Sequence, residues 1–137
     1  MADTVAFKHK AQQYHWNVEG NDFPMYHTFL GNIYEEVDGA IDTLGELIRT
    51  LDAYAPYSLS RLAPLTTIGE GDIAPDAMVM MMSLYNDNNK VLASLMSAYN
   101  EAERFSEYGV SNFIQDRIQA HKKHQWMLRS TLKGEEQ

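Results

Sequence analysis

Apolar residues recur at steps of three and four over most of the chain, which predicts long amphipathic helices rather than strands. The clearest run extends from Asp22 to about Ala53, with Pro24 in its first turn, where a missing N–H is harmless. We expect its apolar stripe to be buried along its whole length. The stripe consists of Tyr26, Phe29, Leu30, Ile33, Val37, Ile41, Leu44, Leu47, Ile48 and Leu51.

Three further long helices are predicted around this run, and one long connection separates the second helix from the third. The helices cover residues 3–18, with Asp3 or Thr4 as N-cap, 76–108 or slightly less, and 111–133, between Gly109 and Gly134. The connection, 55–75, holds three of the four prolines, and residues 58–62 could form a short helix within it. Four long helices with one crossover are typical of an all-α, ferritin-like four-helix bundle.

Length and composition limit the possibilities further. With 137 residues, of which 45% are hydrophobic, the chain suits a single domain spanning 1–137. The absence of cysteine excludes thiolate zinc sites, iron–sulfur clusters and cysteine nucleophiles, and it fits a reducing cytoplasm. No apolar run approaches the ~20 residues that a membrane span needs, and the N-terminus lacks the apolar core of a signal peptide. A soluble, cytoplasmic protein without a membrane partner is therefore expected.

The net charge of −8 makes DNA an unlikely partner. An acidic chain repels the phosphate backbone unless a local basic patch overrides the total charge. Here the basic residues are scattered, and none of the first seven residues is basic. An acidic surface instead suits solubility or the attraction of cations.

The candidate chemistry lies in two histidines and two carboxylates, His15, His27, Asp42 and Glu46. Imidazole and carboxylate together suit a borderline metal such as iron or zinc. His27 and Asp42 fall in one predicted helix, however, and at ~1.5 Å per residue they are roughly 22 Å apart. Either the set is a coincidence, or folding or assembly brings distant positions together.

Two copies of the second helix packed antiparallel about a two-fold axis would solve this distance problem. If His27 of one copy faces Asp42 or Glu46 of the other, the axis passes near residues 35–36. His15 would join His27 through the turn at residues 20–21, and Asp42 and Glu46 are one helical turn apart. The helix glycines at 31, 39 and 45 predict a close approach by another backbone, either in the chain or between subunits.

A metal centre inside a single bundle is disfavoured. Such centres draw carboxylates from all four helices and use a Glu-x-x-His step on two of them. No Glu precedes any of the five histidines by three residues. His121 and His124 are three apart and could bind zinc, but no third ligand is nearby, and packing is the simpler interpretation.

Specific motifs in residues 15–49 resemble the Dps family, the starvation-induced mini-ferritins that protect DNA. The matching segments are His15-Trp16-Asn17-Val18-x-Gly20, Phe23, His27, Ile33-Tyr34-Glu35-Glu36 and Ile41-Asp42-x-Leu44-x-Glu46-x-Ile48-Arg49. The remaining helices match by layout more than by motif.

The resemblance implies a homododecameric hollow shell with ferroxidase sites at its two-fold interfaces. In that arrangement His15 and His27 come from one subunit, Asp42 and Glu46 from its mate, and all four act as catalytic metal ligands. The family oxidises ferrous iron, preferably with hydrogen peroxide, and stores the ferric product. Zinc is a possible substitute metal. The acids Glu101, Glu103, Glu107 and Asp116 could line entry pores or simply be solvated.

Two departures from the family pattern leave alternatives open. Members commonly carry another acidic ligand four residues after the second histidine, where this chain has Gly31; Glu35 or Asn32 could substitute. A non-catalytic, metal-buffering cage is one rival function. A DNA-compacting structural protein is the other, but the lysine-rich N-terminal tail of many members is missing here.

Overall fold

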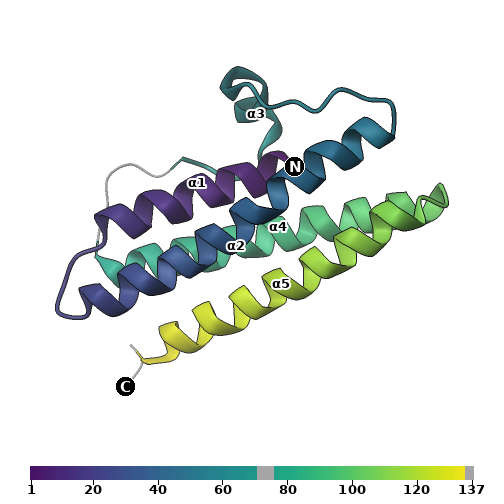
Figure 1. Cartoon of the computed structure of the whole chain (residues 1–137). Helices are drawn as coiled ribbons and strands as arrows, with labels where there is room; N and C mark the ends of the chain where they lie inside the picture. The colour runs from purple at the N-terminus through teal and green to yellow at the C-terminus, as the bar shows by residue number, and fades with distance from the viewer. Residues whose placement is uncertain (71–75, 135–137) are drawn as a thin grey trace.

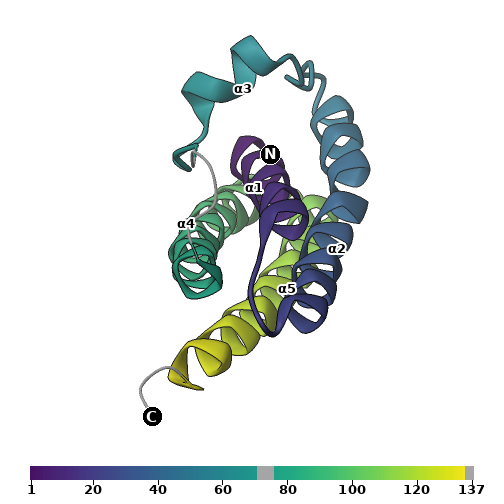
Figure 2. The same cartoon turned by 90° about the vertical axis from the view of Figure 1, so that its left-hand side faces the viewer.

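The computed structural model describes residues 1–70 and 76–134, and it contains four long helices and one short one. Figure 1 shows the long helices side by side, and the view in Figure 2 shows α3 outside the bundle, beyond α1. The bounds are α1 Ala2–Asn17, α2 Phe23–Thr50, α3 Leu59–Leu65, α4 Ala77–Arg104 and α5 Tyr108–Lys133. This arrangement confirms the predicted all-α bundle, with its crossover and short helix; residues 71–75 of that crossover and 135–137 of the predicted domain lie outside the described part.

No helix in the described residues is both long and apolar enough to span a bilayer. The long helices instead bury one face each. The side chains that are essentially inaccessible come from all four of them and include Phe7, Leu30, Met80, Met81, Leu84 and Leu128. Fully burying one such side chain contributes about 1.5–3 kcal/mol, so this shared core holds the helices together.

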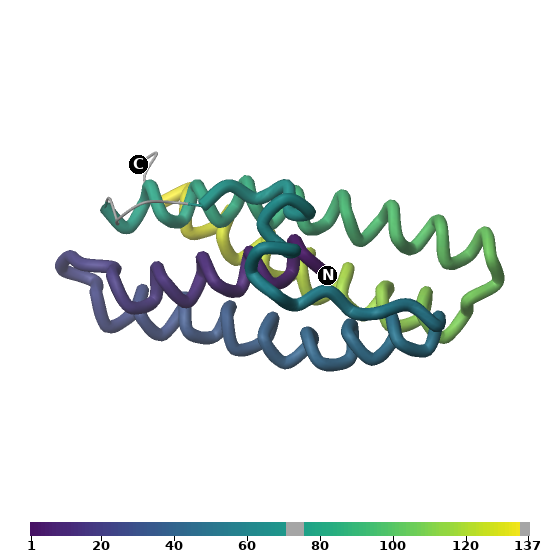
Figure 3. The backbone as a smooth tube through the Cα atoms, turned by 90° about the horizontal axis from the view of Figure 1, so that it is seen from above, coloured from purple at the N-terminus to yellow at the C-terminus, as the bar shows by residue number. Residues whose placement is uncertain are grey.

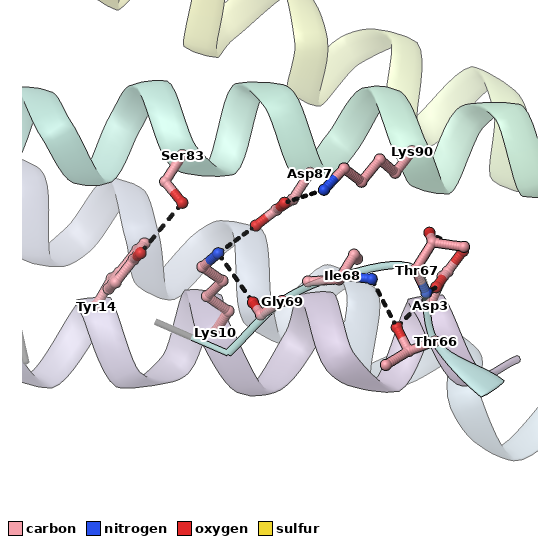
Figure 4. Close-up of polar contacts among 10 residues, drawn as sticks. All are labelled: Asp3, Lys10, Tyr14, Thr66, Thr67, Ile68, Gly69, Ser83, Asp87 and Lys90. Atoms are coloured by element: carbon pink, nitrogen blue, oxygen red, sulfur yellow. Dashed lines mark hydrogen bonds and ion pairs between the residues drawn. The ribbon is translucent and has the colours of Figure 1, made fainter. Parts of the chain in front are cut away.

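The predicted N-cap of the first helix is wrong. The helix already begins at Ala2, and Asp3 lies inside it with its side chain buried. The Asp3 carboxylate accepts hydrogen bonds from Thr66 and Thr67 of the crossover (Figure 4). It also accepts one from Ser94 of α4. Burial alone would raise the pKa of Asp3, but these hydrogen bonds outweigh burial and lower it. Asp3 therefore fastens the crossover to the bundle rather than starting a helix.

The predicted boundary between the last two helices also needs correction. The third long helix ends at Arg104, and Gly109 lies inside α5 rather than before it. The chain reverses through Ser106, whose φ is 58°, and the Glu107 N–H donates to the Ala102 carbonyl at 2.8 Å. That bond closes the end of α4, so the next helix starts three residues earlier than expected.

The apolar stripe of α2 is fully buried only in its middle. Leu30, Ile33, Val37 and Ile41 are buried, whereas Leu51 is 47% exposed, contrary to the predicted continuous burial. The cause is the length of its neighbour, because α1 has 16 residues and α2 has 28. Seen from above, α2 extends past the N-terminal end of α1 (Figure 3). The later apolar positions therefore lack a helix to pack on.

The short helix α3 covers part of the space beyond α1. Its residue Leu62 is buried against Val5 of α1 and Ile41 of α2, forming a small apolar cluster separate from the main core.

Lys10 of α1 joins this helix to α4 and to the crossover. It pairs with the buried Asp87 of α4 at 2.6 Å and donates to the Gly69 carbonyl at 3.2 Å (Figure 4). These contacts fix the position of α1 against α4.

A polar cluster joins α2 to α5; its Arg117 and histidines are buried, and its carboxylate, Glu36, is partly open to solvent. Arg117 binds the Glu36 carboxylate through two nitrogens, at 2.6 and 2.9 Å, and the His124 Nε2–H donates to the same carboxylate at 2.9 Å. Arg117 also donates to His121 Nε2 at 3.2 Å. On its other side, His121 donates from Nδ1 to Asn88 Oδ1 at 2.7 Å.

This cluster settles the histidine pair of α5. His121 and His124 are both buried, and each is engaged by its neighbours in the bundle. Burial and the positive Arg117 lower the pKa of His121 to about 3, so the ring is neutral. The alternative of a zinc pair at these histidines is wrong, because their nitrogens serve the contact between helices.

Replacing Arg117 by Met should destabilise the fold by about 3 kcal/mol, because it leaves the Glu36 charge without its bidentate partner. We take the lower end of the usual range since the Glu36 side chain is 39% exposed. The measurement is the free energy of unfolding in urea. Asp38→Asn is the control, because Asp38 is exposed, its pair with Lys8 spans 3.6 Å, and the pair should contribute less than about 1 kcal/mol. Equal losses in the two variants would contradict the role of the cluster.

Acidification should destabilise the protein through His121. Its pKa is near 6.5 when unfolded and about 3 when folded, so between these values only the unfolded chain binds the proton. The contribution of neutral His121 to the free energy of unfolding is therefore fully present above pH 6.5. As the pH drops below 6.5, the free energy of unfolding decreases by about 1.4 kcal/mol per pH unit, or about 2 kcal/mol by pH 5. Urea unfolding at fixed protein concentration measures the slope. The His121→Gln variant should be less stable at pH 7, but its free energy of unfolding should fall with pH by about 1.4 kcal/mol per pH unit less than that of the wild type. An unchanged slope would refute this.

Candidate metal centre

A tight turn brings the two candidate histidines together. Helix α1 ends at Asn17, and the chain turns through Gly20, whose φ of 124° suits glycine alone among ordinary residues. The Phe23 N–H then donates to the Gly20 carbonyl at 3.1 Å as α2 begins. As a result the last turn of α1 lies against the first turns of α2, and His15 lies beside His27.

Two crossed hydrogen bonds fix both rings. His15 Nδ1 lies 2.6 Å from the carbonyl oxygen of His27, and His27 Nδ1 lies 2.7 Å from the carbonyl oxygen of His15. A carbonyl only accepts, so both Nδ1 atoms carry the proton. In a neutral imidazole the lone pair is then on Nε2, which is the atom that binds a metal. The fold thus selects the ligating tautomer of both side chains.

The two rings are also stacked. Their centroids are 3.7 Å apart and their planes differ by 18°. Phe23 lies next to His27 on one side, at 5.1 Å, and Tyr34 lies next to His15 on the other, at 5.2 Å. The stack and the crossed bonds together leave the rings little freedom, so a metal would meet a preorganised pair of donors.

Asp42 and Glu46 form a second pair further along α2. Both are exposed, and they lie close enough that hydrogen bonding to Asp42 and repulsion from its charge raise the pKa of Glu46. Two carboxylates crowded in this way gain from a cation bound between them. They line a surface depression with Ile41, Gly45 and Arg49.

The two pairs do not meet within one chain. Helix α2 is continuous from Phe23 to Thr50, so His27 and Asp42 remain roughly 22 Å apart at ~1.5 Å per residue. In the described part of the chain, no three histidine or acidic side chains gather where one ion could bind. The chain therefore holds the histidine pair and the carboxylate pair apart, and the four-residue site stays a prediction that needs a second copy.

Sequence reasoning assigned the α2 glycines to a close backbone contact, and within this chain that is wrong. Gly31 faces the ring of His15, a side chain, and a Cβ atom there would lie 2.9 Å from His15 Cε1. Gly39 has nothing within 4 Å of such an atom, and Gly45 makes only ordinary contacts. The sequence did indicate that residue 31 lies one turn after His27 on the same helix face. The spacing does not indicate where the His15 ring lies.

Comparison with known proteins identifies relatives of this chain among the ferritin-like proteins. The whole chain, residues 1–137, matches the family model of the Ferritin-like domain. An uncharacterized low temperature-induced protein of Nostoc sp. is 30% identical over 98% of this chain and 76% of its own length. A DNA protection during starvation protein of Brevibacillus brevis is 29% identical over 96% of this chain and 89% of its own.

Solved structures agree with the sequence matches. The Dps protein from Vibrio cholerae O1, described as a member of a broad superfamily of ferritin-like diiron-carboxylate proteins, superposes with a TM-score of 0.92. It is 28% identical, over 96% of this chain and 82% of its own. A Dps protein from Bacillus brevis gives 0.91 and 27%, over 96% and 88%. This chain belongs to the Dps family of ferritin-like proteins.

Proposed function

We propose that this protein is the subunit of a hollow, homododecameric cage that oxidises ferrous iron and stores the ferric product. The ferroxidase site consists of His15 and His27 from one subunit and Asp42 and Glu46 from its two-fold mate. Membership of the ferritin-like family supports iron storage and protection against oxidative damage in general. The oxidant, the cage and the shared site are the specific parts of the proposal.

The observation that carries the proposal is the crossed histidine pair. Both rings are held with Nδ1 protonated, which leaves two imidazole nitrogens ready to bind without further rearrangement. The buried histidine His121 has both ring nitrogens hydrogen-bonded within the bundle instead. The contrast supports a ligand role for His15 and His27.

The chemistry asks little of the protein beyond holding iron. Two ferrous ions each give up one electron, and one hydrogen peroxide accepts both electrons with two protons and becomes two waters. Carboxylates favour this direction, because the ferric ion gains more from anionic oxygen than the ferrous ion does. Reducing peroxide by two electrons also avoids release of hydroxyl radical, which fits a protective function.

Exposed apolar side chains around the histidines support self-assembly. Trp16 is 65% exposed and Met25 60%, and both flank the histidine pair in sequence. Large apolar groups gathered at such a place usually mark an interface. An antiparallel second copy of α2 would cover them, and Gly39, open on the α2 surface, allows a close approach.

The alternative supported by a specific observation is a zinc-buffering cage. Two imidazoles and two carboxylates complete a four-coordinate site of the kind zinc prefers, and Gly31 adds no further donor. Such a cage would bind metal without oxidising it. DNA compaction has weaker support, because the net charge is −8. We place the working cage in the cytoplasm, where a cysteine-free metal store is at no disadvantage.

Subunit mixing tests the shared site directly. Cages made only of His27→Ala, or only of Asp42→Ala, should oxidise ferrous iron with peroxide at least about 10-fold more slowly, because a ligand is missing from every site. Cages reassembled from equal amounts of both variants should recover about a quarter of the wild-type rate. Half the two-fold pairs are then mixed, and each mixed pair has one intact site and one doubly defective site. The ferric absorbance rise measures the rate.

The control is His9→Ala, which removes an exposed histidine of α1 that has no part in the site. No recovery on mixing would overturn the shared site. Full activity in the single variants would overturn the ligand assignment itself. Tight zinc binding without any ferric absorbance in the wild type would favour the buffering cage.

A further inference from the structure

The His15 ring lies where it does because of its hydrogen bond to the His27 carbonyl. In an α-helix the carbonyl of residue i points along the axis toward residue i+4. The carbonyl of His27 therefore points toward Gly31, and the His15 Nδ1–H that donates to it at 2.6 Å must lie beside Gly31. The hydrogen bond of His15 and the lack of a side chain at Gly31 therefore belong to the same arrangement.

The space at residue 31 is fully occupied by that ring. A Cβ atom on Gly31 would be 2.9 Å from His15 Cε1, closer than real Cβ atoms approach, and 3.1 Å from His15 Nδ1, which is tighter than most real contacts. The ring cannot move sideways freely, because Tyr34 is at 5.2 Å on one face and His27 is stacked at 3.7 Å on the other. Any side chain at 31 would therefore stretch the Nδ1 hydrogen bond or open the stack.

We propose that Gly31 is a positioning residue of the metal site: its missing side chain admits the His15 ring into the stack and so sets the direction of both Nε2 atoms. The inference rests on the proposed function, since it assigns a purpose to the ligand pair. Gly31 therefore contributes to the site although it offers no donor atom. The absence of a side chain on α2 leaves room for a preorganised pair of imidazoles.

Zinc binding to the assembled, metal-free protein tests the proposal without any redox step. Gly31→Ala should weaken zinc affinity about 10- to 100-fold, the usual cost of disturbing a group that orients a ligand. Competition with a chromophoric chelator measures the affinity. Gly109→Ala is the matched control, because it adds the same methyl group to a helical glycine with nothing within 4 Å, and its affinity should be unchanged.

A double-mutant cycle separates positioning from a general effect on the helix. His15→Ala removes the ring that a Cβ at position 31 would strike, so adding Gly31→Ala to that variant should change zinc affinity less than about 2-fold. The same Gly31→Ala loss in both backgrounds would overturn the proposal. If Gly31→Ala alone fails to assemble, the double variant should assemble again, and continued failure would also overturn it.

The cobalt(II) absorption spectrum gives a second measurement. Its visible bands depend on coordination geometry, so they should shift or weaken in Gly31→Ala and stay unchanged in Gly109→Ala. Identical spectra and affinities for Gly31→Ala and the wild type would refute the positioning role while leaving the site intact. Wild-type zinc binding that does not depend on His15 would instead refute the proposed function.

Discussion

The structure around the candidate site depends on two hydrogen bonds that cross between α1 and α2. Each joins a histidine Nδ1 to the backbone carbonyl of the other histidine. The His15 carbonyl lies in the last turn of α1, where a helix leaves carbonyls without partners, so the bond also completes the helix end. These two hydrogen bonds thus hold α1 against α2, satisfy a backbone carbonyl at the end of α1 and fix the tautomer that leaves Nε2 free to bind a metal. Both the turn at Gly20 and the space at Gly31 are needed for this arrangement.

Helix α2 is held from a second direction by the polar cluster at its middle. Glu36 faces α5 and binds Arg117 and His124, while His27 faces α1. These contacts join the middle of α2 to α5 and so fix which side of α2 lies against α5. The orientation decides which residues remain outside, and Asp42 and Glu46 are among them. The polar cluster therefore helps to set which face of α2 stays exposed, and in the proposed cage that face would meet the second copy.

Sequence periodicity predicted the four long helices well, because a repeat of three and four residues survives small errors at the ends. It misplaced Asp3, because the partners of its side chain, Thr66 and Ser94, lie far along the chain. It misplaced Gly109, because the chain reverses at Ser106, a residue without glycine's freedom, and not at the glycine. For the site, spacing predicted that His15 and His27 would meet across a glycine turn. It could not predict the crossed bonds or the purpose of Gly31, because both depend on the direction of a ring.

The continuity of α2 has a consequence for the proposed activity. A helix of this length is rigid, so no motion of one subunit brings His27 to Asp42 across roughly 22 Å at ~1.5 Å per residue. A lone subunit would hold at most a histidine pair or a carboxylate pair, each too poor in donors to retain iron strongly. Ferrous iron would then be oxidised only where two subunits meet, beside the space that stores the product. In the proposed cage, dividing the ligands between subunits would make the chemistry conditional on assembly.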